Sequence, residues 1–255
     1  MKHYQIAFVG MGSIGKRHLN NVCQLIISHG DTYSIDLYRS SMNRELPEDV
    51  NALVSNQYLC SQEVQRDYDM VFITNPTSLH LDTAVKFRPF TKAFFIEKPV
   101  FSSSDMDEQV IALLDEIPSY VACPLRYNPV LQYVKQNVEL EKAISVRAIS
   151  SSYLPDWRPG QDYRETYSAH KELGGGVDID LIHEWDYLTW IFGMPTECLG
   201  IAGRFSNLEI NSNDTALYVA KNDRMTYELH LDYFGRKTQR TLDIFTQDDT
   251  IQCDI

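Results

Sequence analysis

The first fifteen residues restrict the fold more than any other stretch of this chain. Residues 4–9 are mostly apolar and predict a buried strand, and the run Gly10-Met11-Gly12-Ser13-Ile14-Gly15 follows at once. A helix is then expected from about Ser13 to Ser28. In such a strand–G-x-G-x-x-G–helix unit the first glycine makes a tight turn, the second lets a pyrophosphate approach the backbone, and the third allows close helix–strand packing. This order predicts a dinucleotide-binding Rossmann domain in which the whole run contacts the cofactor.

The end of the second predicted strand bears on which dinucleotide is bound. Residues 33–38 predict that strand, and Arg39 and Ser40 follow it. NAD sites usually have an acidic residue here for the ribose 2′-hydroxyl, whereas a guanidinium suits the 2′-phosphate of NADP. Asp36 comes too early for this role and is expected within the strand. The sequence therefore favours NADP over NAD, and a solvated loop arginine is the alternative for Arg39.

A third strand end supplies further candidates for the cofactor site. Residues 69–73 predict a strand, and Thr74, Asn75 and Pro76 follow it, with His80 in the helix that comes next. Ligands of open α/β sheets bind at the carboxyl ends of the strands, so these four residues are predicted to lie beside the cofactor. A histidine in the first turn of a helix is often structural, and this alternative stays open.

Residues 93–100 place a charged pair directly after another short apolar strand. Glu97, Lys98 and Pro99 follow Ile96, so Lys98 is expected at the ligand-binding edge of the sheet, and Glu97 and Lys98 next to the cofactor. Partial burial lowers the pKa of a lysine, which lets it exchange a proton near neutral pH. The alternative is a strand that ends in a solvated Glu-Lys pair. A helix over residues 105–116 and a strand over 120–123 complete this domain, residues 1–122.

The second half of the chain, residues 123–255, has a different pattern. A helix is expected over residues 129–138 and a strand over 143–153, and four later segments alternate like an antiparallel meander. The fold predicted is therefore α/β: a doubly wound parallel Rossmann sheet, followed by an α+β domain with a mostly antiparallel open sheet. The irregular stretch 154–173 is rich in aromatic and basic side chains, which stack on sugars and bind carboxylate or phosphate. The predicted substrate-binding residues are Arg126, Tyr127, Trp157, Arg158, Tyr163, Tyr167 and His183.

A triple glycine, residues 174–176, precedes a predicted helix over residues 177–192. At about 100° per residue, one face of that helix carries four polar side chains, Asp180, His183, Glu184 and Tyr187. Burying so many ionisable groups is costly without partners, so this face is expected to line a cleft. A polar face in contact with water is the alternative.

Composition narrows the possible function classes. The formal net charge of -12 and the lack of a dense basic stripe argue against a nucleic-acid surface. No apolar run approaches membrane-spanning length, and the N-terminus has no signal-peptide pattern. The five cysteines are scattered and never occur as C-x-x-C, which favours reduced thiols in a cytoplasm and argues against structural zinc. No metal is expected, since His170 and His183 also lack partners at metal-ligand spacing.

Four motifs in this order make the whole chain resemble the glucose–fructose oxidoreductase / inositol dehydrogenase / rhizopine-catabolism (Gfo/Idh/MocA) oxidoreductase family. They are the glycine run, Thr74-Asn75-Pro76 with His80, Glu97-Lys98-Pro99, and the triple glycine followed by Asp180 and His183. The resemblance implies an open second sheet that supports oligomer contacts, hence a homodimer or homotetramer. It implies hydride transfer between NADP or NAD and a carbon of a sugar, sugar nucleotide or polyol. Lys98, Asp180 and His183 would act on the hydroxyl or carbonyl that is converted.

The chain departs from the family pattern in two respects. Asp180 and His183 are three residues apart where the family usually has four, and Glu184 occupies the fourth place. The chain is also several tens of residues shorter than usual and ends within a predicted strand, so a shortened C-terminus is one interpretation. Two rival functions stay open. One is a non-catalytic NAD(P)-binding sensor or scaffold, which would be expected to lose the catalytic base; the other is a reductase of a non-sugar carbonyl or imine.

Overall fold

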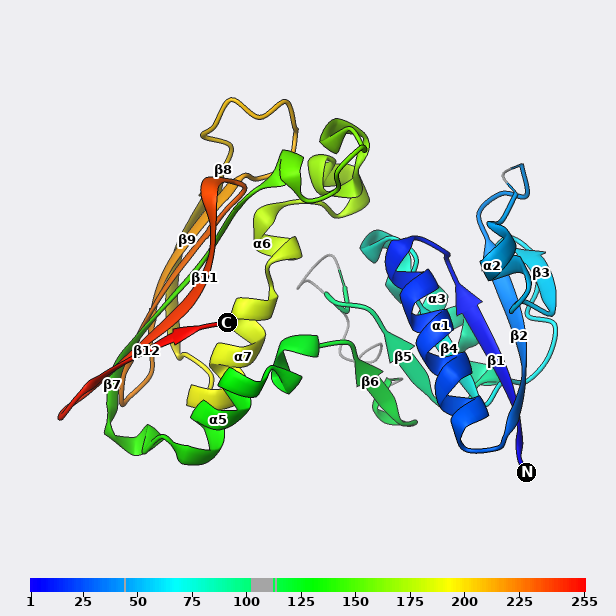
Figure 1. The fold of residues 1–255 in the computed structure, drawn as a ribbon, viewed down its shortest axis with the longest axis horizontal. Coiled ribbons are helices and arrows are strands. Elements are labelled where there is room, and N and C mark those ends of the chain that lie inside the picture. Colours follow the sequence, from blue (N-terminus) through cyan, green and yellow to red (C-terminus); the bar gives the residue numbers. More distant parts are fainter. Residues whose placement is uncertain (44, 102–111, 113) are drawn as a thin grey trace. The chain divides into compact units, whose positions relative to one another are not determined.

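The chain folds into two compact units. The computed structural model describes residues 1–43, 45–101, 112 and 114–255 (Figure 1). Unit 1 spans Met1–Ala122 and unit 2 spans Cys123–Ile255. Most of the helix predicted over residues 105–116 lies outside the described residues. No helix among the described residues is long and apolar enough to cross a membrane.

Unit 1 is built on a parallel sheet. Its strands are β1 (His3–Val9), β2 (Thr32–Arg39), β3 (Asn56–Leu59), β4 (Met70–Ile73), β5 (Phe94–Ile96) and β6 (Ser119–Val121). They are arranged in the order β3-β2-β1-β4-β5-β6, and every neighbouring pair is parallel. This is the strand order of a dinucleotide-binding Rossmann domain. The predicted fold class is therefore confirmed for this half of the chain.

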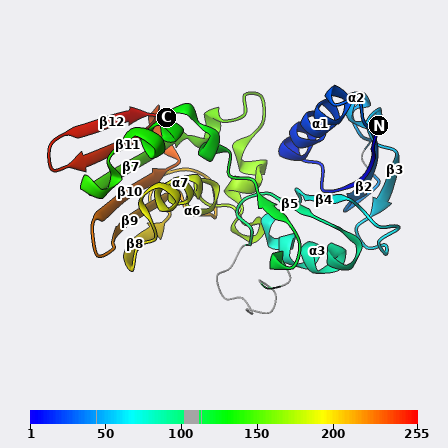
Figure 2. The ribbon, with the colours of Figure 1, turned by 90° about the horizontal axis from the view of Figure 1, so that it is seen from below.

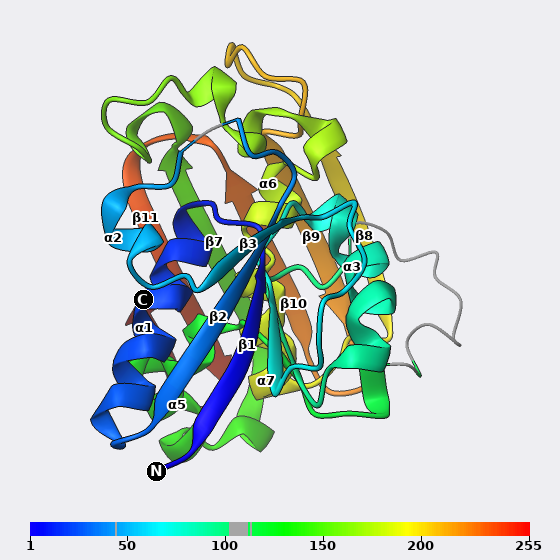
Figure 3. The same ribbon diagram turned by 90° about the vertical axis from the view of Figure 1, so that its right-hand side faces the viewer.

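Alternate residues of these strands face two apolar layers. Ile6 and Phe8 of β1 pack with α1 (Ser13–Ser28), whereas Ala7 and Val9 pack on the opposite face with α3 (His80–Phe87). Figures 2 and 3 show α1 and α3 on opposite sides of the sheet. Unit 1 also contains α2 (Glu48–Asn51) and 3₁₀ turns at Thr77–Leu79 and Arg88–Phe90. Burial on both faces explains why the central strands β4 and β5 are apolar throughout.

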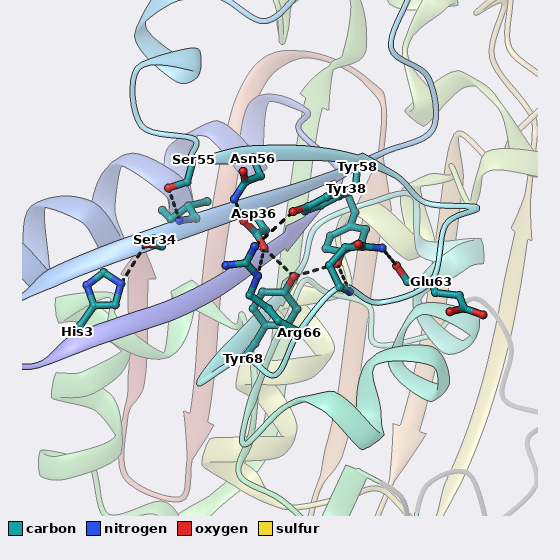
Figure 4. A network of polar contacts seen from close by, with 12 residues as sticks. His3, Ser34, Asp36, Tyr38, Ser55, Asn56, Tyr58, Glu63, Arg66 and Tyr68 are labelled. Atoms are coloured by element: carbon teal, nitrogen blue, oxygen red, sulfur yellow. Dashed lines mark hydrogen bonds and ion pairs between the residues drawn. The ribbon is translucent and has the colours of Figure 1, made fainter.

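Asp36 is completely buried within β2. Figure 4 shows its carboxylate between Asn56 Nδ2 at 2.8 Å, the Tyr68 hydroxyl at 2.9 Å and Arg66 Nε at 3.1 Å. The Tyr68 hydroxyl also contacts the hydroxyl of Tyr38 at 2.9 Å. These donors replace the water that the carboxylate loses on burial, and they join β2 to β3 and to the segment before β4. Asp36 is thus a structural residue of the strand, as its early position in the sequence indicates.

Unit 2 contains a second six-stranded sheet. Its strands are β7 (Ala143–Tyr153), β8 (Glu197–Gly203), β9 (Thr215–Lys221), β10 (Thr226–Asp232), β11 (Phe234–Thr246) and β12 (Thr250–Asp254). The order is β12-β11-β7-β10-β9-β8, and all pairs are antiparallel except β10 with β7. The mostly antiparallel sheet is confirmed. A simple meander is wrong, because β7 lies between β10 and β11 rather than at an edge.

Helices cover one face of this sheet. In Figure 1, α5 (Pro129–Asn137), α6 (Val177–Asp180) and α7 (His183–Phe192) lie on the same side of it. One apolar cluster joins residues of all three helices to the inward-facing residues of the central strands. The irregular segments are held as short 3₁₀ turns at Pro124–Tyr127, Leu140–Lys142, Leu154–Asp156, Tyr163–Glu165, Tyr167–Ala169 and Lys171–Leu173.

The helix predicted over residues 177–192 is interrupted after Asp180. Leu181 leaves the helical region with φ -98° and ψ 26°, and the Ile182 N–H bonds the Ile179 carbonyl at 3.4 Å. Asp180 accepts a hydrogen bond from Tyr233 at 2.6 Å, so tertiary contacts outweigh the local preference for a continuous helix. The angles expected from an unbroken helix are therefore wrong, and Asp180 and His183 belong to two different helices.

Two residues of the predicted polar face lie in the core of unit 2 and do not line a cleft. Glu184 and Tyr187 of α7 are both fully buried. Glu184 Oε1 accepts a hydrogen bond from Arg240 Nε of β11 at 2.8 Å. Burial raises the pKa of Glu184, and the Arg240 guanidinium opposes that shift. The ion pair is the physical reason why an ionisable face can turn inward, since each charge is the other's partner.

The variant Arg240→Met tests this buried pair. It leaves Glu184 without its partner, so the free energy of unfolding at pH 7 should fall by about 3–5 kcal/mol. A raised pKa means that the folded protein holds the Glu184 proton more tightly than the unfolded chain. Stability therefore falls as the pH rises through the folded-state pKa, and the deficit of the variant should shrink between pH 7 and about pH 5. Urea denaturation at several pH values measures both effects.

The matched control is the double variant Arg240→Met/Glu184→Gln, which removes the unpaired charge as well. It should recover most of the lost stability and lose the dependence on pH. Equal stability of Arg240→Met and the unsubstituted protein at pH 7 would show that the pair does not hold α7 to the sheet.

Candidate active site

The glycine run forms a tight turn against the end of β4. Gly10 has φ +91°, and a Cβ atom there would lie 2.7 Å from the backbone of Asn75. At Gly15 a Cβ would meet Thr74 Oγ1 at 2.9 Å, and that hydroxyl donates to the Gly10 carbonyl at 2.9 Å. The first and third glycines of the predicted fingerprint are thus required by contacts within the protein. They bring the start of α1 close to the carboxyl ends of β1 and β4.

Gly12 differs from the other two glycines. It is the N-cap residue of α1 with an extended backbone, and a Cβ built there meets no atom within 4 Å. The side chain is therefore missing for a reason other than protein packing, and the open space adjoins the free N–H groups of a 16-residue helix. This geometry fits a pyrophosphate, which needs close access to the backbone and the positive end of a helix.

Arg39 and Ser40 lie at the carboxyl end of β2, beside the glycine turn. The Gly10 N–H bonds the Tyr38 carbonyl at 3.0 Å, which fixes the glycine turn against this strand end. Arg39 Nη1 donates to Gln57 Oε1 at 2.8 Å, and Gln57 Nε2 donates to Asn51 Oδ1 at 3.2 Å. The guanidinium is therefore supported by β3 and α2. A supported guanidinium at this strand end has the chemistry to bind a 2′-phosphate.

His80 connects the turns that follow β4 and β5. Its Nε2 lies 2.9 Å from the Asn75 carbonyl, and its Nδ1 lies 3.0 Å from the carbonyl of Pro99 and 3.1 Å from that of Val100. The ring is 1% exposed. Burial lowers the pKa of His80, and the carbonyl contacts oppose that shift. The structure places His80 behind the two turns, where it positions Asn75 and the turn after Lys98.

Glu97 and Lys98 follow β5, with Pro99 after a cis peptide bond. One carboxylate oxygen of Glu97 lies 2.5 Å from Nε2 of His18 on α1, and the other accepts the Lys98 N–H at 3.2 Å. Both side chains of the His18–Glu97 pair are largely buried. The carboxylate thus joins α1 to the backbone that carries Lys98. His18 was not predicted from the sequence, although its position three residues after Gly15 places it on the same helix as the glycine run.

Asp180 is held by two tyrosines of unit 2. Its carboxylate accepts hydrogen bonds from the hydroxyl of Tyr167 and, at 2.6 Å, from that of Tyr233. Asp180 is 4% exposed, and Tyr233 is fully buried. Burial raises the pKa of Tyr233, and the neighbouring Asp180 charge adds to that shift, so this phenol remains a donor. Both oxygens of the carboxylate are engaged, which suits a residue that orients its neighbours.

The triple glycine brings Tyr167 to Asp180. A Cβ at Gly175 would lie 2.1 Å from the Tyr167 carbonyl, and the Gly175 N–H bonds the His170 carbonyl at 3.0 Å. Only a glycine permits this approach of the segment before the helix to the residues that open it. His183 is the first residue of α7 and is partly exposed. Asp180, Tyr167 and His183 are thus gathered at the junction of α6 and α7.

The predicted substrate-binding residues divide into two groups. Arg126 forms a bidentate pair with Asp186, at 2.6–3.1 Å, and its charge is already balanced. Tyr127 is 69% exposed, and the Tyr163 hydroxyl accepts the Glu209 N–H at 3.2 Å. Closer to Asp180, Trp157 packs edge-on against Tyr233, with ring centroids 5.2 Å apart.

Arg158 lies over the ring of Tyr167, 5.9 Å from its centroid. Tyr167 itself bonds Asp180. The structure therefore links Trp157, Arg158 and Tyr167 to Asp180.

Tyr233 was missed by the sequence interpretation. It lies 53 residues after Asp180, between β10 and β11, and no local pattern connects the two. Among the described residues, no group of three or more His, Cys, Asp or Glu side chains is placed to hold a metal ion.

Comparison with known proteins agrees with this geometry. The family described as an oxidoreductase family with an NAD-binding Rossmann fold (Gfo/Idh/MocA) matches residues 4–122. The uncharacterized oxidoreductase YrbE of Bacillus subtilis is 24% identical over 277 aligned positions, which cover 95% of this chain and 74% of that protein.

Several solved structures of similar fold are dehydrogenases. Myo-inositol 2-dehydrogenase from Lactobacillus plantarum superposes with a TM-score of 0.80 at 19% identity, covering 98% of this chain and 76% of its own. The WlbA dehydrogenase from Bordetella pertussis, in complex with NADH and UDP-GlcNAcA, has a TM-score of 0.80 at 18% identity and covers 98% of this chain and 77% of its own. The family match covers the residues that form the glycine turn and the Glu-Lys-Pro turn. Residues 4–122, nearly all of unit 1, match the Gfo/Idh/MocA family of oxidoreductases, with its NAD-binding Rossmann fold.

Proposed function

We propose that the protein transfers a hydride between NADP or NAD and a CH–OH carbon of a sugar, sugar nucleotide or polyol. The observation that carries the proposal is the Glu97 carboxylate, which joins His18 on the phosphate-binding helix to the N–H of Lys98. This contact fixes the position of the Lys98 backbone relative to the glycine turn. The dehydrogenases of similar fold include one crystallised with NADH and a UDP-linked sugar acid, which supports a substrate of this class.

The proposed mechanism uses Lys98 and His183. A bound nicotinamide would supply the hydride acceptor for the oxidation and the hydride donor for the reduction. In the oxidative direction, His183 or Lys98 removes the proton of the substrate hydroxyl while the hydride leaves the carbon that carries this hydroxyl. A carbonyl group forms. In the reductive direction, the Lys98 cation stabilises the alkoxide that develops on the oxygen. Asp180 contributes through Tyr167 and Tyr233, both of which it accepts hydrogen bonds from.

The variant Lys98→Met tests the catalytic assignment. Methionine keeps most of the side-chain length but removes the proton and the charge. We expect kcat to fall by about 100- to 10,000-fold, while NAD(P)H affinity changes little because the glycine turn holds the pyrophosphate. The measurements are steady-state turnover on a panel of inositols, sugars and UDP-sugars, and fluorescence titration of the reduced cofactor.

The control is Lys92→Met, which removes an exposed lysine of the same unit that pairs with Asp69 at 2.7 Å. It should behave like the unsubstituted protein. Near-normal turnover of Lys98→Met would refute the role of Lys98. Cofactor binding by the unsubstituted protein without turnover of any substrate in the panel would favour the sensor or scaffold alternative.

We further propose that NADP binds at least as tightly as NAD, because Arg39 and Ser40 occupy the strand end where NAD sites usually have an acidic residue. Arg39→Ala should weaken NADPH binding by about 10- to 100-fold, which corresponds to the loss of hydrogen bonds to a charged group, and should change NADH binding little. Arg88→Ala, which removes an arginine paired with Glu116, is the control. A tenfold preference for NADH that Arg39→Ala leaves unaltered would contradict the proposal.

We also propose that unit 2 forms a homodimer or homotetramer through the face of its sheet that the helices leave uncovered. Four apolar side chains oppose one another there, in the pairs Leu199 with Val219 and Ile201 with Leu217, and their exposed fractions range from 38% to 80%. An exposed apolar cluster of this kind is typical of an interface.

Light scattering at micromolar concentration tests the assembly. The unsubstituted protein should have the mass of a dimer or tetramer, and Val219→Asp should lower that mass towards the monomer because it places a charge in the cluster. Leu25→Asp, at an exposed apolar residue of α1, should leave the mass unchanged. A monomer in the unsubstituted protein would overturn this proposal.

A further inference from the structure

Two arginines of unit 2 differ from the other six in their partners. Six of the eight donate to a protein oxygen: Arg126 to Asp186, Arg147 to Glu228, Arg164 to Asp162, Arg204 to the Ile210 carbonyl, Arg224 to the Phe192 carbonyl and Arg240 to Glu184. Arg158 and Arg236 instead contact the faces of tyrosine rings, and within the described part of the chain neither donates to a protein oxygen. Their hydrogen-bonding edges are therefore available to a ligand.

The aromatic contacts restrain these two guanidinium groups, that of Arg236 closely and that of Arg158 more loosely. The Arg236 Cζ lies 3.6 Å from the ring centroid of Tyr153, and the Arg158 Cζ lies 5.9 Å from that of Tyr167. A ring that packs on the face of a guanidinium does not block the N–H groups at its edge. These groups can bind a carboxylate or phosphate with two parallel hydrogen bonds. Because the ring restricts the side chain beforehand, less entropy is lost when such an anion binds.

Both arginines are connected to the tyrosines that bind Asp180, Arg158 by contact and Arg236 by its place in the chain. Tyr167, which Arg158 covers, donates its hydroxyl to Asp180. Arg236 follows Tyr233, the second donor to Asp180, within the part of β11 where the register with β7 shifts between Phe234 and Gln239.

The backbone around Arg236 is also fixed. The buried Asp232 carboxylate accepts the N–H groups of Phe234 at 3.1 Å and Gly235 at 2.8 Å, which holds the turn that presents Arg236. Trp157 completes the connection, since its Nε1 donates to Ser152 at 2.8 Å and its ring packs on Tyr233.

The charge of the whole chain makes this arrangement informative. The sequence has 35 acidic and 23 basic residues, so carboxylates are available to pair with almost any arginine. Arg164, six residues after Arg158, pairs with both Asp162 and Glu209. Asp156 is exposed two residues before Arg158, yet no ion pair between them is present. In an acidic protein, guanidinium groups that rest on aromatic rings and have no carboxylate partner are suited to bind an anion.

We propose that Arg158 and Arg236 bind an anionic group of the substrate, a carboxylate or a phosphate, next to Asp180. The inference rests on the proposed oxidoreductase function and narrows its substrate class to acidic or phosphorylated sugars, sugar nucleotides included. The sequence interpretation had considered arginines of the stretch 154–173 and Arg126 for such a group. In the structure, Arg126 pairs with Asp186, and Arg164 pairs with Asp162 and Glu209, so neither is included in the proposed anion site. Arg236 is included in addition to Arg158.

The experiment is isothermal titration of the full-length protein, saturated with NADH or NADPH, with four probes. Glucose is neutral, glucuronate carries only a carboxylate, UDP-glucose only a diphosphate, and UDP-glucuronate both. At least one anionic probe should bind ten or more times more tightly than glucose. Arg158→Gln and Arg236→Gln should each weaken that binding about 10- to 100-fold, while glucose binding stays the same. Losses confined to glucuronate or to UDP-glucose identify the carboxylate or the diphosphate as the source.

Arg147→Gln is the matched control. Arg147 also packs on a ring, 5.5 Å from the Phe245 centroid, but its charge is paired with Glu228 at 2.8 Å. Its substitution should leave all four affinities unchanged. Arg236→Lys keeps the charge without the planar fork and should bind with intermediate affinity. Thermal unfolding of each variant checks that the fold is intact.

The outcomes separate the two proposals. Failure to bind either reduced cofactor would refute the oxidoreductase proposal itself. Cofactor binding in which no anionic probe exceeds glucose would overturn the anion site. The same holds if Arg158→Gln and Arg236→Gln bind the anionic probes as tightly as Arg147→Gln does.

Discussion

The close approach of the glycine turn to the end of β4 is the constraint on which unit 1 depends. Gly10 leaves room for the backbone of Asn75, and Gly15 leaves room for the side chain of Thr74. Because these contacts exclude even one methyl group, β1, α1 and β4 have a single way to meet. Two histidines then extend the arrangement to β5: His18 binds Glu97, and His80 binds the carbonyls of Asn75 and Pro99. The cofactor region is thus a set of strand ends joined by short polar contacts.

In unit 2, two carboxylates of the helices are buried. Glu184 lies in the core because Arg240 reaches it from β11, and Asp180 is almost fully buried because Tyr167 and Tyr233 donate to it. In both cases the partner comes from the sheet or from the segment before the helices. A buried charge is tolerated only when partners satisfy it, so these contacts fix where α6 ends and where α7 begins.

The sequence predicted those parts of the molecule whose signals are local. The glycine run, the apolar strands and the Glu-Lys-Pro turn follow one another along the chain, so the Rossmann sheet and its strand-end residues could be read from spacing. β3 was not predicted, because Asn56–Leu59 is a short edge strand with mostly polar residues. The break after Asp180 and the contacts of Tyr233 and Arg236 depend on strands more than fifty residues away. No periodicity in the helix itself reports such partners, and propensity alone favours a continuous helix.

The support of Arg39 has a consequence for how this protein can change over time. Gln57 and Asn51 hold the arginine from β3 and α2, whereas Lys98 is held through Glu97, His18 and His80 from α1, β4 and β5. Among these contacts of described residues, the two sets have no side chain in common. Substitutions around Arg39, the residue proposed to select the dinucleotide, can therefore accumulate at the edge of the sheet without disturbing the contacts of Glu97. Under the roles proposed for Arg39 and Lys98, cofactor preference and chemistry would be separable traits, each open to selection or redesign on its own.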